Sequence, residues 1–528
     1  TGVNEMTATT EILRLADLTR FHAGERPDAV AMVHEGRETS YAELDRHASQ
    51  IANGLIAAGL QPQARVAILD KNSDSFFEVL FGAAKANTVL VAVNWRLAPP
   101  EVAYVVNDAM AEALFVGREF FPVIEKVLPE LKTVKTVIAI DEPHGGWDHF
   151  PAWRDAQSAT DPHVAVAGTD VAIQMYTSGT TGHPKGAQLT NDNFFALLPS
   201  AAREWGEVWT PEDVNLVCMP LFHIAGSGWA IVGLYAGVKT VIVRDIIPPE
   251  ILRLIPLHGV TRALFVPAVM LFLLQTPGVQ ETDFSTLRFI AYGASPIPLD
   301  LLRGAMATFK CNLAQVYGLT ETTGVVTYLP PEDHDPNGNQ RMRSCGRPLA
   351  NVTIRIVNEQ GEDVPIGEVG EIICKTPQVM KGYWNLPEET ARAIRGEWFY
   401  TGDAGFLDAD GYVYIHDRVK DMIVSGGENV YPAEVESALF GHPAIADVAV
   451  IGVPDDRWGE AVKAVVVKKP GAEVTPEEII AFARERIAGY KVPKSVDFAE
   501  TLPRNPSGKI LKRELRTPYW AGRARQVN

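Results

Sequence analysis

The chain has 528 residues, of which 46% are hydrophobic and 21% charged, so it is a globular protein too long for one core. Its net charge of −17 argues against a nucleic-acid partner. Uninterrupted apolar runs stay below the roughly 18 residues of a membrane-spanning helix, and the first residues lack the basic and apolar regions of a signal peptide. We therefore expect two or more domains and no transmembrane segment.

Helical and strand-like patterns alternate in the first part of the chain. An amphipathic helix is expected over residues 41–60, followed by a strand over 65–70, a helix over 75–85 and a strand over 88–93. This order is typical of βαβ units with parallel strands. Further strand-like runs continue the alternation at residues 215–220, 239–245, 262–267 and 287–293. The pattern predicts a large α/β domain with two βαβ-type subdomains.

The pattern changes twice from about residue 352. Short alternating runs at residues 352–357 and 369–375 predict an antiparallel, β-barrel-like subdomain. A polar segment with a Gly-Gly turn then precedes a helix beginning at Pro432, and a compact α+β pattern comes next, with strands at 446–453 and 461–469 and a helix at 476–487. We expect an N-terminal domain at residues 1–419 and a small α+β domain at residues 420–528.

The cysteines show no spacing typical of a zinc site, and they lie far apart: Cys218, Cys311, Cys345 and Cys374. This usage predicts reduced, structural thiols in a cytoplasmic protein.

Charge is distributed unevenly between the two expected domains. From Asp421 to the end there are 15 basic and 15 acidic residues, so the preceding residues carry the whole net charge, and from Ala481 onward the balance is 11 basic to 4 acidic. This excess is either a solvated basic tail or a basic module brought up to phosphates that are held elsewhere.

Residues 176–190 read YTSGTTGHPKGAQLT, a β-prone lead-in followed by glycines, hydroxyl residues and a lysine. The run is not a Walker A loop, because Pro184 and Gly186 stand where that motif needs its second glycine and its Ser/Thr. Glycines let backbone N–H groups converge on an oxyanion, hydroxyls donate to phosphate oxygens, and Lys185 supplies charge. A phosphate-binding loop is predicted in preference to a Gly/Thr surface turn.

This run resembles the phosphate-binding signature of the adenylate-forming superfamily, which includes acyl-CoA synthetases, nonribosomal peptide adenylation domains and firefly-type luciferases. Six further signatures of that family come after it in the family's order, and the resemblance extends from about Tyr41 to Lys512. They are FHIAG (222–226), GASP (293–296), YGLTET (317–322), YTGD (400–403), HDRVKDMIVSGGENVYPAEVE (416–436) and PRNPSGKI (503–510).

The resemblance implies a two-step reaction. A carboxylic acid attacks the α-phosphate of ATP, giving acyl-AMP and pyrophosphate, and a thiol then takes the acyl group. It implies ATP, Mg²⁺ and coenzyme A as cofactors and substrates. The residues expected to bind ATP and AMP are Thr177, Ser178, Gly179, Thr180, Thr181, Gly182, Lys185, Gly293, Ala294, Ser295, Tyr317, Gly318, Thr320, Asp403, Arg418 and Lys509.

Individual roles also come from the resemblance. Glu321 and Thr177 are expected to bind Mg²⁺, since both offer hard oxygen donors. The ring of Tyr317 is expected to stack on adenine, Thr320 to contact the α-phosphate, and Asp403 and Arg418 to bind the ribose. Lys509 would stabilise the charge that develops during adenylation. The residues that the resemblance implies to be catalytic are Lys509, Glu321, Thr320 and His223.

The second step implies that the small C-terminal domain is mobile. In the family it rotates about the residue two positions after the ribose-binding arginine, which is Lys420 here and matches the boundary drawn from the sequence. After rotation the turn Ser425–Gly426–Gly427 would line the path for the pantetheine arm of CoA. The basic excess would then meet the phosphates of ATP or CoA.

Family positions place the acyl pocket along His223, Gly226, Trp229, Phe265, Val266, Tyr292, Gly293, Gly318 and Leu319. His223 is expected to act as a gate between the carboxylate and the thiol path, or else to be an ordinary core histidine. The other residues are mostly apolar and include no Lys or Arg, which favours medium- or long-chain fatty acids or aryl-alkanoic acids over dicarboxylates. Tyr292 would shorten the tunnel if it points into it.

The function expected from these residues is that of an AMP-forming acyl-CoA synthetase in fatty-acid and lipid metabolism. One alternative is transfer of the acyl group to the phosphopantetheine of a carrier protein, and another is a non-catalytic homologue that binds nucleotide or acyl-AMP. The intact Lys185, Glu321, Asp403, Arg418 and Lys509 argue against a non-catalytic homologue. A homodimer and peripheral contact with a membrane stay open.

Overall fold

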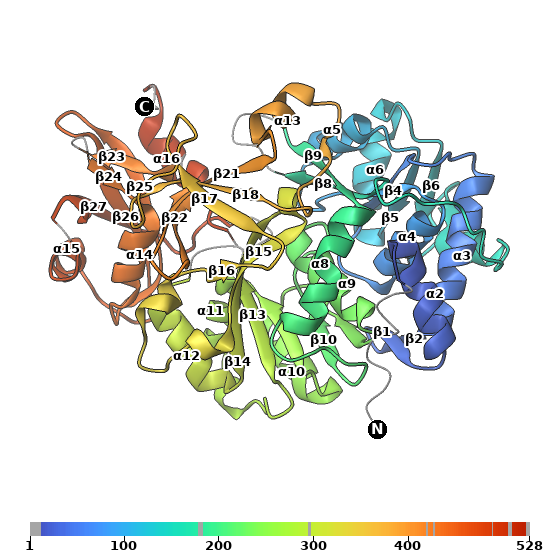
Figure 1. Cartoon of the computed structure of the whole chain (residues 1–528), viewed down its shortest axis with the longest axis horizontal. Coiled ribbons are helices and arrows are strands. Elements are labelled where there is room, and N and C mark those ends of the chain that lie inside the picture. The colour runs from blue at the N-terminus through green and yellow to red at the C-terminus, as the bar shows by residue number, and fades with distance from the viewer. Residues whose placement is uncertain are drawn as a thin grey trace.

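The computed structural model describes residues 12–177, 183–293, 297–418, 421–425, 428–487, 489–504 and 509–523. Two large sheets with their helices form most of the molecule, a smaller sheet lies beside them, and a fourth sheet forms the C-terminal domain at the left of Figure 1. The chain is therefore α/β with a large N-terminal part and a small C-terminal domain, as the sequence predicts.

One large sheet has eight strands, in the order β19 (Gly382–Tyr383), β9 (Lys185–Thr190), β8 (Val171–Thr177), β4 (Val89–Ala92), β3 (Arg65–Leu69), β5 (Ala113–Val116), β6 (Thr136–Ala139) and β7 (Asp148–His149). The strands from β8 to β7 are parallel, whereas β9 and β19 run antiparallel to their neighbours. Its helices are α2 (Leu15–Glu25), α3 (Tyr41–Ala57), α4 (Asp74–Lys85), α5 (Pro99–Ala109), α6 (Phe121–Val127) and α7 (Phe150–Asp155).

The second large sheet has nine strands, in the order β16 (Arg347–Pro348), β15 (Gly324–Leu329), β14 (Asn312–Leu319), β13 (Phe289–Gly293), β12 (Arg262–Phe265), β10 (Val214–Val217), β11 (Lys239–Ile242), β1 (Val30–His34) and β2 (Arg37–Ser40). Its centre, from β1 to β14, is parallel. The associated helices are α8 (Asn191–Glu204), α9 (Ile224–Tyr235), α10 (Pro248–His258), α11 (Pro267–Gln275) and α12 (Leu299–Phe309).

Local sequence explains why these helices begin where they do. The side chain of Ser40 accepts a hydrogen bond from the Glu43 N–H at the start of α3, and Ser73 does the same for Phe76 at the start of α4. Strand β3 is buried on both faces: Val66 and Ile68 join one hydrophobic core, and Ala67 and Leu69 join the core formed with α5 and α6. Burial on both faces is typical of parallel sheets covered by helices.

Apart from β19, the strands after residue 352 form two antiparallel-rich sheets. The first contains β17 (Thr353–Val357), β18 (Gly370–Lys375), β21 (Trp398–Leu407), β20 (Ile394–Arg395) and β22 (Val413–Arg418), with α13 (Pro387–Ala393) beside it. The C-terminal domain has β24 (Glu428–Val430), β23 (Ile423–Ser425), β26 (Gly459–Lys468), β25 (Ile445–Asp455) and β27 (Ser495–Phe498), with α14 (Pro432–Phe440), α15 (Pro476–Arg484) and α16 (Lys512–Trp520). The chain changes sheet between Arg418 and Ile423.

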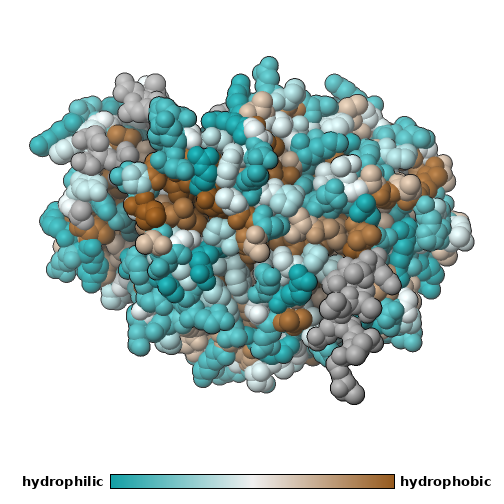
Figure 2. All heavy atoms as spheres, in the orientation of Figure 1, coloured by the Kyte–Doolittle hydropathy of each residue, from teal (hydrophilic) through white to brown (hydrophobic). Residues whose placement is uncertain are grey.

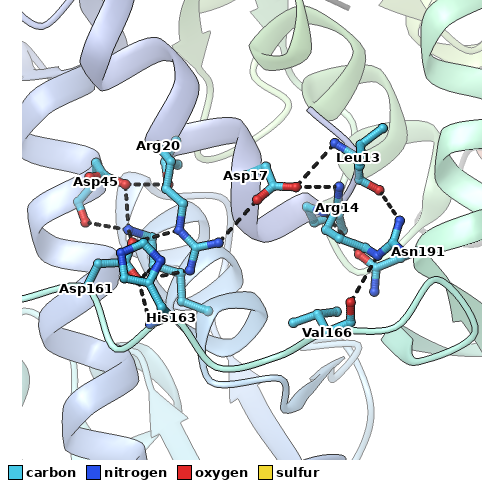
Figure 3. Close-up of polar contacts among 12 residues, drawn as sticks. Leu13, Arg14, Asp17, Arg20, Asp45, Asp161, His163, Val166 and Asn191 are labelled. Atoms are coloured by element: carbon cyan, nitrogen blue, oxygen red, sulfur yellow. Dashed lines mark hydrogen bonds and ion pairs between the residues drawn. The ribbon is translucent and has the colours of Figure 1, made fainter. Parts of the chain in front are cut away.

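Buried ion pairs fix the N-terminal helices to the segment that leads into β8. The ammonium of Lys85 is fully buried and contacts Asp45 Oδ1 at 2.5 Å and Asp161 Oδ2 at 2.8 Å. Arg20 binds both oxygens of Asp161, and Figure 3 shows Arg20, Asp45 and Asp161 gathered in one cluster. These contacts anchor the segment that precedes β8, the first strand of the β8–β9 hairpin.

Candidate active site

A cavity of about 500 Å³ lies between the C-terminal domain and the N-terminal part. Four residues predicted for the nucleotide site line it: Tyr317, Gly318, Asp403 and Lys509. Helices α11 and α12 contribute an apolar wall, and α14 faces them with Glu434 and Glu436. In Figure 2, apolar residues form a band across this face that includes the junction between the two parts. Residues far apart in sequence thus converge on one cavity.

Tyr317 and Asp403 are joined directly. The hydroxyl of Tyr317, on β14, donates a hydrogen bond to Asp403 Oδ2 at 2.6 Å, and Asp403 lies on β21 of another sheet. The backbone N–H of Asp403 donates to Thr401 Oγ1, which fixes the strand locally. Burial, and then the charge of Asp403, hold the pKa of Tyr317 well above its usual value. The hydroxyl that donates to this carboxylate therefore keeps its proton at physiological pH.

Two glycines let the strands around Tyr317 approach closely. A Cβ at Gly293 would lie 2.0 Å from the carbonyl oxygen of Val316, and a Cβ at Gly318 would lie 1.8 Å from that of Gly324. The pairing of β14 with β15 also shifts between Tyr317 and Gly318, as at a β-bulge. These positions are occupied by glycine because the neighbouring backbone leaves no room for a side chain.

The predicted phosphate loop closes the β8–β9 hairpin, in which Thr177 pairs with Lys185. Ser178, Gly179, Thr180, Thr181 and Gly182 lie outside the described residues, as do Ala294 and Ser295. The Lys185 ammonium lies 4.5 Å above the ring centroid of Tyr383 and 3.6 Å from Glu389 Oε2. The positive charge at the base of the loop is thus placed by residues from the 376–393 region.

Glu321, the predicted metal ligand, lies in a single 3₁₀ turn, η4 (Thr320–Thr322), together with Thr320. Its side chain is buried, and Oε1 accepts a hydrogen bond of 3.2 Å from the hydroxyl of Tyr383. Strand β9 and η4 are in contact, so the carboxylate stands beside the hairpin of Lys185. No group of three or more metal-ligating side chains occurs among the described residues. A carboxylate and a hydroxyl fit Mg²⁺ that takes its other ligands from water and phosphate.

Lys509 lies near enough to His223 for its charge to affect the pKa of the imidazole. Burial, and to a smaller extent the positive charge of Lys509, lowers the pKa of His223 to about 3. The Nδ1 atom of His223 accepts a hydrogen bond of 3.1 Å from the Ala225 N–H at the start of α9. The imidazole is therefore neutral at physiological pH, and the C-terminal lysine reaches the wall of the site.

The prediction that the basic excess after Ala481 meets phosphates stays a prediction, and at least three of its 11 basic residues pair with acids inside the C-terminal domain. Lys491 pairs with Glu434, Lys512 with Glu436 and Arg516 with Asp421. Acidic residues of α14 and its neighbours thus neutralise basic residues that lie 57 to 95 positions further along the chain. These ion pairs could not be predicted from the sequence, because their partners lie far apart along the chain.

Of the turn predicted to meet CoA, Ser425 alone lies among the described residues, and it does not line this cavity. Ser425 is buried at the end of β23 and pairs with Glu428 and Gly459, while Gly426, Gly427 and the predicted hinge Lys420 lie outside the described residues. The backbone of Arg418 pairs with Asp403 across β22 and β21. Figure 1 draws β23 and β24 on the outer left, whereas Lys509 lines the cavity.

The residues predicted for the acyl pocket divide into two groups. Gly318 lines the cavity, and Gly293 and Leu319 neighbour it on β13 and β14. Five of the others pack in the core. Trp229 lies against Trp205, Trp209 and Phe289, and Phe265 lies against Phe309. Tyr292 bonds to His334 at 2.8 Å, Val266 is buried, and Gly226 packs against the backbone of Met219 and Pro220. The hydroxyl of Tyr292 is thus directed at His334.

All four cysteines are free, as predicted. Across the described ranges, no helix combines the length and apolar character needed to cross a membrane.

Comparison with known families decides the class. A model described as AMP-binding enzyme matches residues 20–384, and one described as AMP-binding enzyme C-terminal domain matches residues 434–509. The chain belongs to the AMP-binding enzyme family. This membership confirms the resemblance to the adenylate-forming superfamily and makes the chain an AMP-forming acid–thiol ligase.

Similar members of the AMP-binding enzyme family differ in acid and acceptor. The fatty acid–[acyl-carrier-protein] ligase ScoC of Streptomyces coeruleorubidus is 43% identical, covering 98% of this chain and 99% of its own. A feruloyl-CoA synthase of Amycolatopsis sp. is 40% identical over 93% of this chain and 96% of its own. Among solved structures, the anthranilate CoA ligase AuaEII in complex with anthranoyl-AMP has a TM-score of 0.91 at 28% identity, with coverage of 98% and 99%.

Sequence reasoning missed Tyr383 and Glu389, which contact Lys185. It also missed Glu434 and Glu436, the acidic residues of α14 in the C-terminal domain. The Gly-Tyr-Trp run at residues 382–384 was the available signal for Tyr383, since a glycine next to aromatic residues in a strand-like run suggests close packing.

Proposed function

We propose that the chain activates a medium- or long-chain fatty acid or an aryl-alkanoic acid with ATP, releasing pyrophosphate, and transfers the acyl group from AMP to coenzyme A. The observation that carries this proposal is the meeting of Lys509 with Tyr317 and Asp403 in one cavity. A cation at that point counters the charge that develops when a carboxylate attacks a phosphate, and such stabilisation is commonly worth about 10²–10³ in rate.

The residues divide the adenylation step between them. Tyr317 stacks on adenine through its ring and holds Asp403 through its hydroxyl, and Asp403 and Arg418 bind the ribose. Lys185 and the loop before it bind the β- and γ-phosphates, and Thr320 contacts the α-phosphate. Glu321 and Thr177 would hold Mg²⁺, which supplies charge neutralisation between the phosphates. Holding acid and nucleotide in line removes much of the entropic barrier.

A neutral imidazole suits the role proposed for His223, a gate between the substrate carboxylate and the path of the thiol. A charged histidine would bind the substrate carboxylate as an ion pair and keep it from the α-phosphate, whereas a neutral one leaves the negative charge of the acid available to attack. With a pKa of about 3, His223 is neutral at physiological pH.

The outer surface of the C-terminal domain supports CoA as the acceptor. Trp458 is 37% exposed, with the Arg457 guanidinium 4.7 Å and the Lys494 ammonium 5.6 Å from its ring. The next residue, Gly459, pairs with Ser425 of the predicted pantetheine turn. An exposed aromatic ring with two cations suits a nucleotide that carries phosphates. We place the adenine nucleotide of CoA at this ring. We also propose that the protein acts in the cytoplasm, and a homodimer stays a prediction.

Transfer to the phosphopantetheine of a carrier protein is the second candidate, because ScoC, the relative at 43% identity, bears the name of a carrier-protein ligase. Both acceptors present the same thiol on the same arm. They differ in the group at the far end of that arm, which is a nucleotide in CoA and a folded protein in the carrier.

One assay set tests the proposal. Pyrophosphate release is measured with a panel of fatty acids of increasing chain length and aryl-alkanoic acids, and CoA or a phosphopantetheinylated carrier protein is then added. Acyl-CoA formation supports the proposal, and adenylate that reacts only with the carrier protein favours the second candidate. The absence of pyrophosphate with every acid would contradict both.

A further inference from the structure

We propose that Tyr383 is a positioning residue of the activation step, which holds the carboxylate of Glu321 and the ammonium of Lys185 at a fixed separation. The inference rests on the proposed function, since it concerns how this chain presents a metal ligand and a phosphate-binding cation to ATP. Tyr383 belongs to β19, a strand of only two residues.

The contact with Glu321 orients the carboxylate. Tyr383 is 7% exposed, and its hydroxyl donates to Glu321 Oε1 at 3.2 Å. A carboxylate on a flexible side chain rotates about its last bond, and a donor held on one oxygen selects one rotation. Hydrogen bonds to charged groups contribute more than those between neutral groups. Tyr383 thus reduces the reorganisation that Glu321 needs before it binds a cation.

The contact with Lys185 uses the face of the same ring. The ammonium lies 4.5 Å from the ring centroid, within the range of about 6 Å over which a cation is attracted by an aromatic face. Glu389 lies on the other side of the ammonium at 3.6 Å. Lys185 is therefore held between a ring and a carboxylate, and the hydroxyl on that ring also bonds to Glu321.

The backbone around Tyr383 is bonded to both of the elements that its side chain joins. Tyr383 pairs with Ala187 on β9, the strand that Lys185 begins. Three residues earlier, the Met380 N–H donates to the carbonyl oxygen of Glu321 at 2.8 Å. One short segment, residues 376–384, therefore spans the phosphate-loop hairpin and the turn of Glu321, so Tyr383 has little freedom to move.

The turn of Glu321 keeps other anchors when Tyr383 is changed. Gln378 is fully buried, and its Nε2 donates to the carbonyl oxygens of Thr322 and Val325 at 3.2 and 2.8 Å. The Thr323 hydroxyl donates to the carbonyl oxygen of Gln378 at 2.7 Å. A phenylalanine at 383 therefore leaves these backbone anchors in place and removes the hydroxyl that donates to the carboxylate, which separates positioning from folding.

The test is calorimetric binding of α,β-methylene-ATP, an analogue that cannot transfer its AMP group, over a series of Mg²⁺ concentrations. For Tyr383→Phe we expect the Mg²⁺ concentration at half-maximal binding to rise about tenfold, as the loss of a hydrogen bond to a charged group implies. Binding without Mg²⁺ should stay unchanged in this variant, because the ring still faces Lys185. Tyr383→Leu should weaken the metal-free binding as well, by about threefold.

Tyr41→Phe is the matched control, since Tyr41 is buried and donates at 2.6 Å to the Val238 carbonyl oxygen, remote from this site. A Mg²⁺ dependence in Tyr383→Phe equal to that of the wild type overturns the inference, and so does an equal shift in Tyr41→Phe. If the wild type binds no analogue at any Mg²⁺ concentration, the proposed function itself is overturned, and the wild-type titration alone reveals this.

Discussion

Tyr317 and Asp403 stand on different sheets and are joined by a hydrogen bond of 2.6 Å. The two residues were predicted to recognise different parts of the nucleotide, the adenine and the ribose. Their bond makes them one unit, because a shift of the ring moves the carboxylate with it. Recognition of the adenosine is thus built across the boundary between the nine-stranded sheet and the smaller sheet.

Replacing Tyr317 by Phe should keep the stacking surface and remove the donor to Asp403. We expect KM for ATP to rise about tenfold, with kcat changed less than about threefold, because hydrogen bonds to charged groups are worth about 1.5–3 kcal/mol. Pyrophosphate exchange at varied ATP measures both constants. Tyr412→Phe is the control, since Tyr412 makes a similar bond of 2.7 Å to Asp333 outside the cavity lining. A tenfold effect in the control would show a general loss of stability instead.

Gly318→Ala should destabilise the site by overpacking. Its Cβ would lie 1.8 Å from the carbonyl oxygen of Gly324, so β14 and β15 must separate, at a cost of about 1–3 kcal/mol. The midpoint of thermal unfolding should fall and ATP binding should weaken. Gly304→Ala is the opposite case, because Gly304 lies inside α12 and its Cβ would meet only Leu274 at 3.6 Å. That variant should be more stable by about 0.5–1 kcal/mol; a stabilised Gly318→Ala would refute the argument.

The sequence predicted most helices and strands, because the hydrophobic patterns that define them extend over only a few neighbouring residues. The run at residues 65–70 is apolar and became β3, and the helix expected at 41–60 became α3, which ends at Ala57 because Gly59 has a φ of +89°. The helix expected from Ser75 starts one residue earlier, since Ser73 caps it. Errors of this size come from caps and turns, which periodicity does not resolve.

Contacts that join distant segments could not be foretold in the same way. The bond between Tyr383 and Glu321 links residues 62 apart, and no periodicity or composition marks it. Likewise, Lys491 and Lys512 pair with Glu434 and Glu436, which lie at least 57 positions earlier in the chain, so composition alone could not reveal these pairs. Motifs named the residues of the site, but the residues that orient them required the fold.

Stability should depend on pH through His223. Its folded pKa of about 3 lies below the unfolded value of about 6.5, so the unfolded chain takes up a proton first as the pH falls. The contribution is fully present above about pH 6.5 and is lost toward pH 3, by about 2 kcal/mol between pH 6.5 and 5. Urea unfolding at about pH 7 and about pH 5 measures it. His223→Asn should lose less stability over this range than the wild type, and an identical loss would place the imidazole in solvent.

Lys509→Ala should separate the two half-reactions. Pyrophosphate release should fall by about 10²–10³, because the developing charge loses its cation. Thioester formation from supplied acyl-AMP should be retained, since the role proposed for Lys509 belongs to the first step. Lys512→Ala is the neighbouring control: Lys512 also lines the cavity but pairs with Glu436 at 2.7 Å. Equal loss of both half-reactions in Lys509→Ala would contradict the role assigned to it.

Lys420→Pro should block the rotation proposed for the C-terminal domain. Proline fixes φ near about −65°, so a residue that must change its backbone angles between the two steps can no longer do so. The arrangement with Lys509 at the cavity should persist, and pyrophosphate release with acid and ATP should continue. Acyl-CoA formation should be lost, because β23, which ends at Ser425, then stays on the outer side of the domain, as in Figure 1.

Stopped-flow measurement of each half-reaction distinguishes a blocked rotation from a general loss of activity. Lys420→Ala is the matched control, because alanine removes the same side chain but leaves φ free, and it should complete both half-reactions. Loss of acyl-CoA formation in both variants would assign the effect to the lysine side chain instead of the backbone. If Lys420→Pro turns over at the wild-type rate, the pivot lies elsewhere.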